Sequence, residues 1–186
     1  MWHDFNTQIF LLINASDHAS KSFVFFAIFC AKYLVYLSVI IMVIGWCIRP
    51  IYRQLILKIV FSLGLALLVT FVIRYCFYSP RPFEVEVGTN YLFHDKTSSL
   101  PSQHAVFVWT MFFAVFLGNA YRFRTDLYLL ALIAVLVCWS RIYLGIHWPL
   151  DIIVGFILSI LSAYLINKNW ISINKFLNKY VLIERN

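Results

Sequence analysis

Long apolar runs alternate with short polar stretches along almost the whole chain. Five of the runs have the length and apolar character of helices that cross about 30 Å of hydrocarbon. They cover residues 23–48, 56–77, 105–121, 127–144 and 152–166. The pattern therefore predicts an all-α integral membrane protein, built as a bundle of about five transmembrane helices.

The first 16 residues, MWHDFNTQIFLLINAS, follow a different pattern. They lack the basic start and the long apolar core of a cleavable signal peptide, and their apolar part is too short for a full span. We expect them to form a helix at the membrane interface. The chain is then a single polytopic domain over residues 1–186, with an interfacial segment at 1–20 and a cytoplasmic tail at 168–186.

Composition agrees with this class, because 62% of the residues are hydrophobic and the mean hydropathy is +0.82, above the range of ordinary soluble domains. The four cysteines lie within or at the edges of the apolar runs, without metal-type spacing and without a close pair. They are interpreted as small packing residues.

The net charge of +7 is distributed unevenly. With five spans in sequence, the basic turns and the basic tail fall on one side, and by the positive-inside rule that side is cytoplasmic. The N-terminus, residues 78–103 and the turn at 145–149 then face outward. This distribution indicates membrane orientation rather than nucleic-acid binding. The basic residues are Arg49, Arg53, Lys58, Arg122, Arg124, Lys168, Lys175, Lys179 and Arg185, and the outward acids are Asp4, Asp17, Glu84, Glu86, Asp95 and Asp151.

Three polar clusters remain, each at a predicted outward end of a span: RYCFYSPRPF, SSLPSQHAVF and SRIYLGIHWPLD. Because they share one depth and one face of the membrane, they can form a single site. The candidate residues are Arg74 and Arg81 in the first cluster, Ser102, Gln103 and His104 in the second, and Arg141, His147 and Asp151 in the third.

Each cluster also has a purely structural interpretation. Arg74 and Arg81 can be anchors that reach for lipid headgroups, and Ser102 can be the N-cap of the third span. His147 can be an interfacial histidine tied to Asp151. Anchoring alone does not require three arginines, two histidines and a carboxylate on one face, so the combined pattern favours a functional site.

These residue types suit the transfer of a phosphoryl group. Guanidinium groups and the N–H groups at a helix start neutralise and orient a tetrahedral oxyanion. His147 and Asp151 are four residues apart, so Asp151 can accept a proton from one ring nitrogen and leave the other free to attack phosphorus. His104 is then available to protonate the leaving oxygen and later to deprotonate water.

The two histidines and the aspartate could instead bind zinc. Three neighbouring arginines would repel a dication and attract an anion, which favours a site without metal. We therefore expect no metal and no other cofactor.

The three clusters resemble the motif set of the type-2 phosphatidic acid phosphatase family, which reads Lys-x6-Arg-Pro, Pro-Ser-Gly-His and Ser-Arg-x5-His-x3-Asp. Order and spacing match, although arginine replaces the lysine and glutamine replaces the glycine. The resemblance implies a nucleophile, an acid and base, an orienting carboxylate and five phosphate contacts. The implied nucleophile is His147, the acid and base is His104, and the orienting carboxylate is Asp151. The implied phosphate contacts are Arg74, Arg81, Ser102, Gln103 and Arg141.

Within that family, the whole chain is similar to the bacterial undecaprenyl diphosphate phosphatases. The similarity is carried by FNTQIFLLINAS, RPFEVEVGTNYLFHD and WSRIYLGIHWPLDIIVG. It implies an enzyme of the bacterial inner membrane that removes the terminal phosphate of undecaprenyl diphosphate at the outer face through a phosphohistidine, and so recycles the carrier for cell-wall synthesis. The implied partners are a lipid phosphate and the bilayer, with no nucleic acid and no obligate protein partner.

Two alternatives remain open at this point. One is a phosphatase or phosphotransferase that acts on another lipid, such as phosphatidylglycerophosphate, phosphatidic acid or lipid A. The other is a non-catalytic protein that binds or transports a lipid phosphate.

Overall fold

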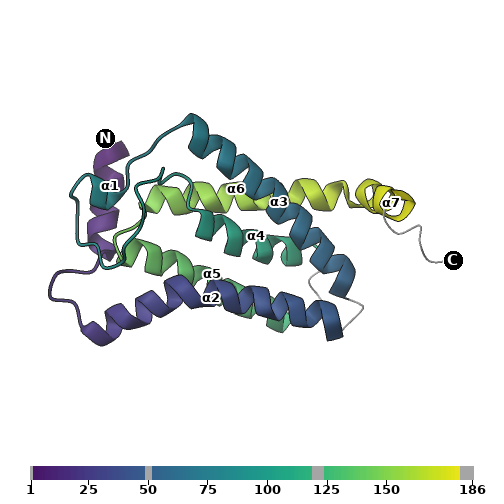
Figure 1. The fold of residues 1–186 in the computed structure, drawn as a ribbon, viewed down its shortest axis with the longest axis horizontal. Coiled ribbons are helices and arrows are strands. Elements are labelled where there is room, and N and C mark those ends of the chain that lie inside the picture. Colours follow the sequence, from purple (N-terminus) through teal and green to yellow (C-terminus); the bar gives the residue numbers. More distant parts are fainter. Residues whose placement is uncertain (1, 49–51, 119–123, 181–186) are drawn as a thin grey trace.

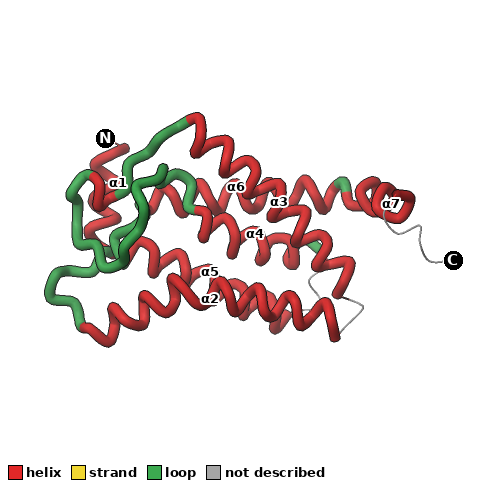
Figure 2. Tube along the Cα trace, in the orientation of Figure 1, coloured by secondary structure: helices red, strands yellow, loops and turns green. Residues whose placement is uncertain are grey.

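In the computed structural model, the described residues are 2–48, 52–118 and 124–180, and all regular elements in these ranges are helical (Figures 1 and 2). The elements are α1 (Trp2–Ile13), α2 (Lys21–Ile48), α3 (Arg53–Cys76), the short 3-10 helix η2 (Pro82–Glu84), α4 (Gln103–Leu117), α5 (Arg124–Tyr143), α6 (Pro149–Lys168) and α7 (Trp170–Tyr180).

Helices α2 to α6 run along the long axis of the molecule, while α1 lies across one end and α7 lies at the other (Figure 1). The central helix is α4, which contacts α3, α5 and α6. The outer helix α2 packs mainly on α5, and α3 packs on α6. The predicted class, a helical membrane bundle with a preceding helix at its end, is confirmed.

The membrane helices differ in length. Helices α2, α3 and α6 are long and apolar enough to cross a membrane, whereas α4 and residues Leu127–Tyr143 of α5 form shorter apolar helices. Part of the predicted span at 105–121 falls on residues 119–123, which lie outside the described residues, as do Arg49, Arg122 and Arg185.

A close crossing of α4 and α6 brings their N-terminal ends together. A Cβ atom added at Gly155 of α6 would lie 3.2 Å from Ala105 Cβ and 3.4 Å from the carbonyl oxygen of Ser102, both on the α4 side. Further along, Ser159 Oγ donates to the carbonyl oxygen of Val106 over 3.0 Å. Small residues at a helix crossing allow such an approach in lipid.

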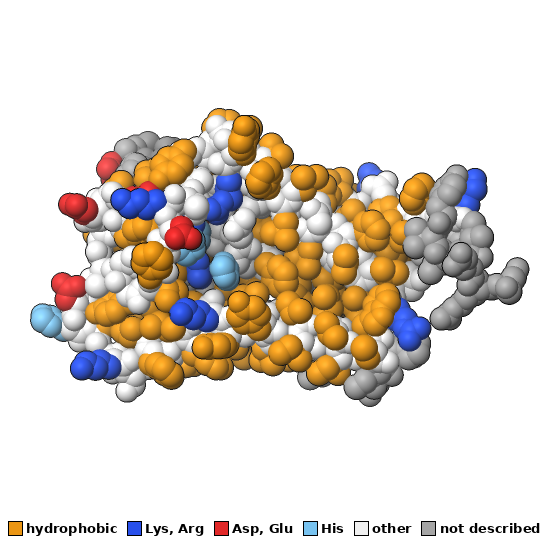
Figure 3. Space-filling view, in the orientation of Figure 1, with side chains coloured by type: hydrophobic (Ala, Val, Ile, Leu, Met, Phe, Trp, Pro, Cys, Tyr) orange, Lys and Arg blue, Asp and Glu red, His pale blue; other side chains and the backbone are white. Residues whose placement is uncertain are grey.

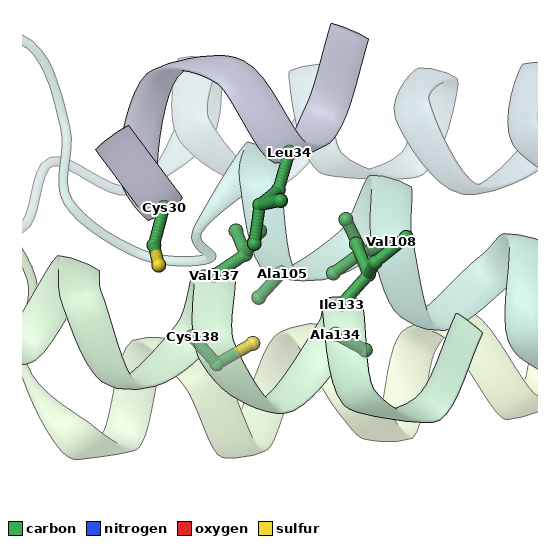
Figure 4. Packing of buried hydrophobic residues seen from close by; sticks show 8 residues of the cluster. All are labelled: Cys30, Leu34, Ala105, Val108, Ile133, Ala134, Val137 and Cys138. Atoms are coloured by element: carbon green, nitrogen blue, oxygen red, sulfur yellow. The ribbon is translucent and has the colours of Figure 1, made fainter. Parts of the chain in front are cut away.

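Apolar side chains fill the space between the other helices. One cluster joins Cys30 and Leu34 of α2 to Ala105 and Val108 of α4 and to a stretch of α5 (Figure 4). The cysteines in it are reduced and buried, as expected of packing residues. The stretch of α5 contributes Ile133, Ala134, Val137 and Cys138.

Helix α1 is attached to the end of the bundle by specific contacts. Phe10 is buried against Trp148, with ring centroids 5.1 Å apart. Asn6 Oδ1 accepts a hydrogen bond from Leu150 N, in the first turn of α6, over 3.0 Å. The Asn14 amide donates to the carbonyl oxygens of Thr89 and Tyr143 over 2.9 and 3.0 Å. The α1 segment therefore holds the loops at this end in place.

The surface agrees with a bilayer-embedded bundle. On the face shown in Figure 3, apolar side chains cover the middle of the molecule, and acidic side chains gather at the end where α1 lies. Lysine and arginine side chains occur at both ends. Among the described acids, Asp4, Asp17 and Asp95 belong to α1 and to the loops at the α1 end.

Helix α7 falls in the segment predicted only as a tail. Lys58 of α3 contacts the junction of α6 and α7: its Nζ atom donates to Asn167 Oδ1 at the end of α6 over 3.0 Å and lies 5.6 Å from the centre of the Trp170 ring at the start of α7. The sequence prediction missed this helix because its hydrophobic residues are spread over a short amphipathic stretch rather than one apolar run.

Candidate active site

The three polar clusters meet at the end of the bundle that α1 covers. Arg74 lies in the last turn of α3, Arg81 follows in the loop, and Ser102 is the N-cap of α4. Arg141 lies in the last turn of α5, and His147 precedes α6. The loops that follow α1, α3 and α5 gather at this same end (Figure 2). The predicted convergence of the clusters is therefore seen in the fold.

His147 and Asp151 form the centre of the site. Their Nδ1 and Oδ2 atoms lie 3.1 Å apart, and both side chains are about 2% exposed. Asp151 Oδ2 also accepts a hydrogen bond from Trp148 N over 2.8 Å. A carboxylate oxygen can only accept, so Nδ1 of His147 carries the proton and Nε2 presents a lone pair.

The sequence predicted this pair from a helical step of four residues, but the local geometry is different. Trp148 is the N-cap of α6, Pro149 opens the helix and His147 lies before it. The contact forms because Asp151, at the third helical position, folds back onto the helix start as in a capping box. One carboxylate thus caps the helix and orients the histidine.

Ser99 is a third member of this buried group, and sequence reasoning did not single it out. Its hydroxyl is fully buried, donates a hydrogen bond to Asp151 Oδ2 and lies 3.3 Å from His147 Nδ1. The only signal in the sequence was its place three residues before Ser102, in the cluster SSLPSQHAVF.

Arg81 is buried and faces the other nitrogen of the histidine. Its Nη1 atom lies 3.2 Å from His147 Nε2 and donates to the carbonyl oxygen of Ile146 over 3.0 Å. Its Nε atom donates to the carbonyl oxygen of Thr97 over 2.9 Å. Burial, with a further contribution from the charge of Arg74, lowers the pKa of Arg81 to about 10, so the side chain is cationic at neutral pH.

Arg74 reaches the same loop from α3. Its two terminal nitrogens donate to the carbonyl oxygen of Pro101 over 3.2 Å and to Thr97 Oγ1 over 3.1 Å. Arg81 Nη2 also donates to Thr97 Oγ1 over 3.1 Å. Thr97, which the sequence analysis did not consider, therefore connects the two arginines of the first motif.

Arg141 and Ser102 are buried but incompletely bonded. Arg141 is 3% exposed, and within the described part of the chain its Nε and Nη2 atoms have no hydrogen-bond partner. The hydroxyl of Ser102, fully buried at the start of α4, also lacks one, so Ser102 occupies the N-cap position without a side-chain cap. Buried donors of this kind are costly unless a ligand satisfies them.

The two residues that carry these donors are joined through the backbone to His147 and Asp151. The backbone nitrogen of His147 donates to the carbonyl oxygen of Arg141 over 3.3 Å, and Ser102 N donates to the carbonyl oxygen of Asp151 over 3.2 Å. Burial, then the charges of Arg141 and Arg81, lower the pKa of His147 well below its ordinary value. His147 is therefore neutral at neutral pH.

Gln103 and His104 begin α4. Gln103 is exposed, and His104 is partly buried. Backbone N–H groups in the first turn of a helix have no partner within the helix, so they can bind an anion. All eight predicted site residues therefore lie at this one end of the bundle, although Gln103 presents its side chain outward.

A third histidine joins the site. The rings of His94 and His147 are 6.4 Å apart, at an interplanar angle of 76°. His94 is partly exposed and lies on the loop between η2 and α4. No motif spacing marked it, and only the folding of the loop brings it here.

In the described ranges, no three His, Cys, Asp or Glu side chains are grouped in a way that could hold a metal ion. The expectation of a metal-independent site stays a prediction, to be tested with a chelator.

Comparisons with known proteins place the chain in a family. It is 34% identical over 164 residues to an Escherichia coli (strain K12) protein provisionally named undecaprenyl-diphosphatase YbjG, covering 88% of this chain and 81% of the relative. It is 32% identical over 167 residues to the undecaprenyl-diphosphatase of Sulfolobus acidocaldarius, and the match covers 87% of this chain and 76% of that relative.

Its fold is also similar to a solved structure, that of Aquifex aeolicus LpxE, with a TM-score of 0.68 at 22% identity, covering 87% of this chain and 93% of that one. The sequence profile of the PAP2 superfamily matches residues 55–172, a range that contains all three polar clusters and most of the bundle. The family predicted from the motifs is thereby confirmed: the chain is a member of the PAP2 superfamily.

Proposed function

We propose that the protein is a metal-independent lipid diphosphate phosphatase that removes the terminal phosphate of undecaprenyl diphosphate at the outer face of the bacterial inner membrane. One observation supports this proposal above the others. Arg141 and Ser102 have buried side-chain donors without a partner among the described residues, and they lie near His147, which is neutral and oriented by Asp151. An anionic tetrahedral group would satisfy the donors and lie next to the histidine. The names of the two relatives support the choice of substrate.

In the proposed first step, the lone pair on Nε2 of His147 forms a bond to the terminal phosphorus. The bond from that phosphorus to the bridging oxygen breaks, and its electron pair leaves with the lipid phosphate. Arg81 Nη1 now points at this lone pair, so the substrate must draw that guanidinium onto its own oxygens before attack. Asp151 stabilises the positive charge that develops on the ring.

In the second step, His104 takes a proton from water, and the water oxygen attacks the phosphorus of the phosphohistidine. The bond between phosphorus and Nε2 breaks, and its electron pair returns to His147. His104 then gives the proton to an oxygen of the released inorganic phosphate, which returns both histidines to their starting state. The lipid monophosphate is available again as a carrier for cell-wall synthesis.

Phosphate release by the purified protein in detergent, with EDTA present, tests the function. Undecaprenyl or farnesyl diphosphate should be among the best substrates by kcat/KM in a panel that includes phosphatidic acid, phosphatidylglycerophosphate and lipid A. Better turnover of one of those lipids would assign another substrate. No release from any lipid phosphate would favour a non-catalytic binding protein.

Phosphate trapping tests the mechanism. Labelled substrate should leave acid-labile, base-stable label on the wild-type protein and none on His147→Ala, which should also release no phosphate. Asp151→Asn should fold normally and lower kcat by several powers of ten, by analogy with loss of the carboxylate from a catalytic triad. Wild-type labelling of the His147→Ala protein would point to His104 as the nucleophile.

A further inference from the structure

We propose that His94 binds the phosphate that stays on the lipid, and thereby favours diphosphate over monophosphate substrates. This inference rests on the proposed function and assigns a specificity residue to it. His94 lies outside the three motif clusters.

The position of His94 fits a second phosphate. Its ring is 6.4 Å from that of His147, and it is partly exposed whereas His147 is 1% exposed. His94 is thus the more accessible of two neighbouring rings. A diphosphate extends one P–O–P link beyond the phosphorus under attack, so its second phosphate must lie away from Nε2 of His147, towards the opening.

The loop that carries His94 is held on both sides. Before it, Tyr91 N donates to the carbonyl oxygen of Leu144 over 3.1 Å, and the Tyr91 hydroxyl donates to the carbonyl oxygen of Ser16 over 2.6 Å. After it, Thr97 receives hydrogen bonds from both Arg74 and Arg81. His94 therefore has a fixed position relative to the arginines that face the substrate.

The ring of His94 has one nitrogen available for a ligand. Nδ1 lies 3.1 Å from the carbonyl oxygen of Asp95, which can only accept, so Nδ1 carries a proton. The Nε2 atom is then an acceptor in the neutral ring and a donor in the cation. Burial, then the charge of Arg81, lower the pKa of His94, and Arg141 acts in the same direction.

A bound diphosphate changes that balance. Its negative charges offset those of the arginines, which favours the protonated ring, and the Nε2 proton can then be donated to an oxygen of the second phosphate. By linkage, protonation of His94 strengthens diphosphate binding to the same extent.

The leaving groups explain why a contact with His94 should favour diphosphate over monophosphate substrates. When a diphosphate reacts, the bond to the bridging oxygen breaks and the electron pair leaves on a lipid phosphate, whose added charge a donor at His94 stabilises. When a monophosphate reacts, the leaving oxygen belongs to an alcohol and needs a proton, for which His104 in the first turn of α4 is the candidate acid. A monophosphate has no second phosphate for His94 to bind.

Three substitutions separate the two ring nitrogens. His94→Gln keeps an N–H group near the position of Nε2, His94→Asn keeps one near Nδ1, and His94→Ala keeps neither. His18→Ala is the matched control, because His18 is an exposed histidine in the loop after α1. The measurement is kcat/KM on farnesyl diphosphate and on farnesyl monophosphate, in detergent with EDTA.

We expect His94→Ala and His94→Asn to lower kcat/KM on the diphosphate by about 10- to 100-fold, the effect of one hydrogen bond to a charged group. For these two variants, kcat/KM on the monophosphate should stay within about threefold of the wild-type value, a smaller change than the loss of one such hydrogen bond would cause. His94→Gln should retain most of the diphosphate activity, and His18→Ala should match wild type on both substrates.

Equal losses on both substrates would overturn the inference, and so would activity retained by His94→Asn but lost by His94→Gln, which would indicate that the Nδ1 contact only shapes the loop. In both cases the wild-type protein still hydrolyses the diphosphate, so the proposed function stands. A wild-type protein that releases no phosphate from any diphosphate would overturn the proposed function and, with it, the role of His94.

Discussion

At the residue scale, the site depends on how each polar atom of His147 is occupied. Nδ1 faces Asp151 and Ser99, and Nε2 faces Arg81. The contacts of Nδ1 set the tautomer of the ring. The contact of Nε2 with Arg81 marks the direction from which an anion can reach the lone pair. The contribution of each neighbour can therefore be measured separately.

Ser99 should act as a positioning residue, because its hydroxyl donates to the carboxylate that orients His147. Thr and Val are nearly equal in size, so Ser99→Thr and Ser99→Val differ mainly in the hydroxyl. We expect Ser99→Val to lower kcat by about 10- to 100-fold relative to Ser99→Thr, with KM little changed, because a hydrogen bond to a charged group contributes about 1.5–3 kcal/mol. Equal kcat values for the two variants would show that the hydroxyl is only structural.

Arg74 and Gln103 occupy the two positions where the chain departs from the family motif. Arg74 uses two nitrogens on two acceptors, a geometry that a lysine cannot reproduce. Arg74→Lys should therefore lower kcat/KM on a diphosphate by one to two powers of ten, corresponding to loss of one charge-assisted bond of about 1.5–3 kcal/mol.

Gln103→Gly is the matched variant for that experiment. The Gln103 side chain is exposed, so only its backbone should contact phosphate, and activity should stay within about tenfold, or roughly 1.4 kcal/mol. An inactive Gln103→Gly protein with unchanged fold would mean that the side chain itself binds substrate.

The pH dependence should reflect the neutral state of His147. Because burial and the charges of Arg141 and Arg81 lower its pKa, the neutral ring persists as the pH falls through the ordinary value of 6.5, and protonation at lower pH removes the attacking lone pair. After correction for ionisation of the substrate, kcat/KM should be constant from about pH 7.5 to 6.5 and fall only in more acidic solution. Loss of activity centred on 6.5 would contradict a lowered pKa.

At the element scale, the crossing of α4 and α6 brings Ser102 to Asp151. A larger residue at Gly155 should push the helices apart, because an added Cβ already lies 3.2 Å from Ala105 Cβ. We expect Gly155→Leu to lower the apparent Tm by several degrees, since overpacking costs about 1–3 kcal/mol, and to lower kcat as the two helix starts separate.

Gly64→Leu provides the control on α3, where an added Cβ has no neighbour within 4 Å. It should leave both the apparent Tm and kcat near their wild-type values. If Gly155→Leu behaves in the same way as Gly64→Leu, the close approach of α4 and α6 is not what positions the site.

At the scale of the whole molecule, the proposed orientation places the α1 end outside the cell and α7 in the cytoplasm. Single cysteines at the exposed positions His18 and Lys175, in a protein whose four native cysteines are replaced, should report this difference. In intact cells, an impermeant maleimide should label His18→Cys and should label Lys175→Cys only after lysis, because basic segments remain in the cytoplasm. The reverse pattern would place the site on the cytoplasmic side.

The sequence alone determined the membrane class, the succession of spans and the membership of the eight predicted residues in three clusters. It could do so because hydropathy and motif spacing are local properties. An apolar run must form a helix in lipid to satisfy its backbone, whatever the rest of the chain does. The same reasoning indicated which side each cluster occupies, since the charge of a turn is also read locally.

Only the tertiary structure decided which partners these residues have. Ser99 meets Asp151 across 52 positions of the chain, Thr97 joins Arg81 to Arg74, and His94 reaches His147 from an irregular loop. A serine, a threonine or a histidine in a loop belongs to no repeating sequence pattern from which a distant partner could be predicted. Their roles follow from the packing of α4 against α6 and from the attachment of α1, which set where the loop between α3 and α4 can lie.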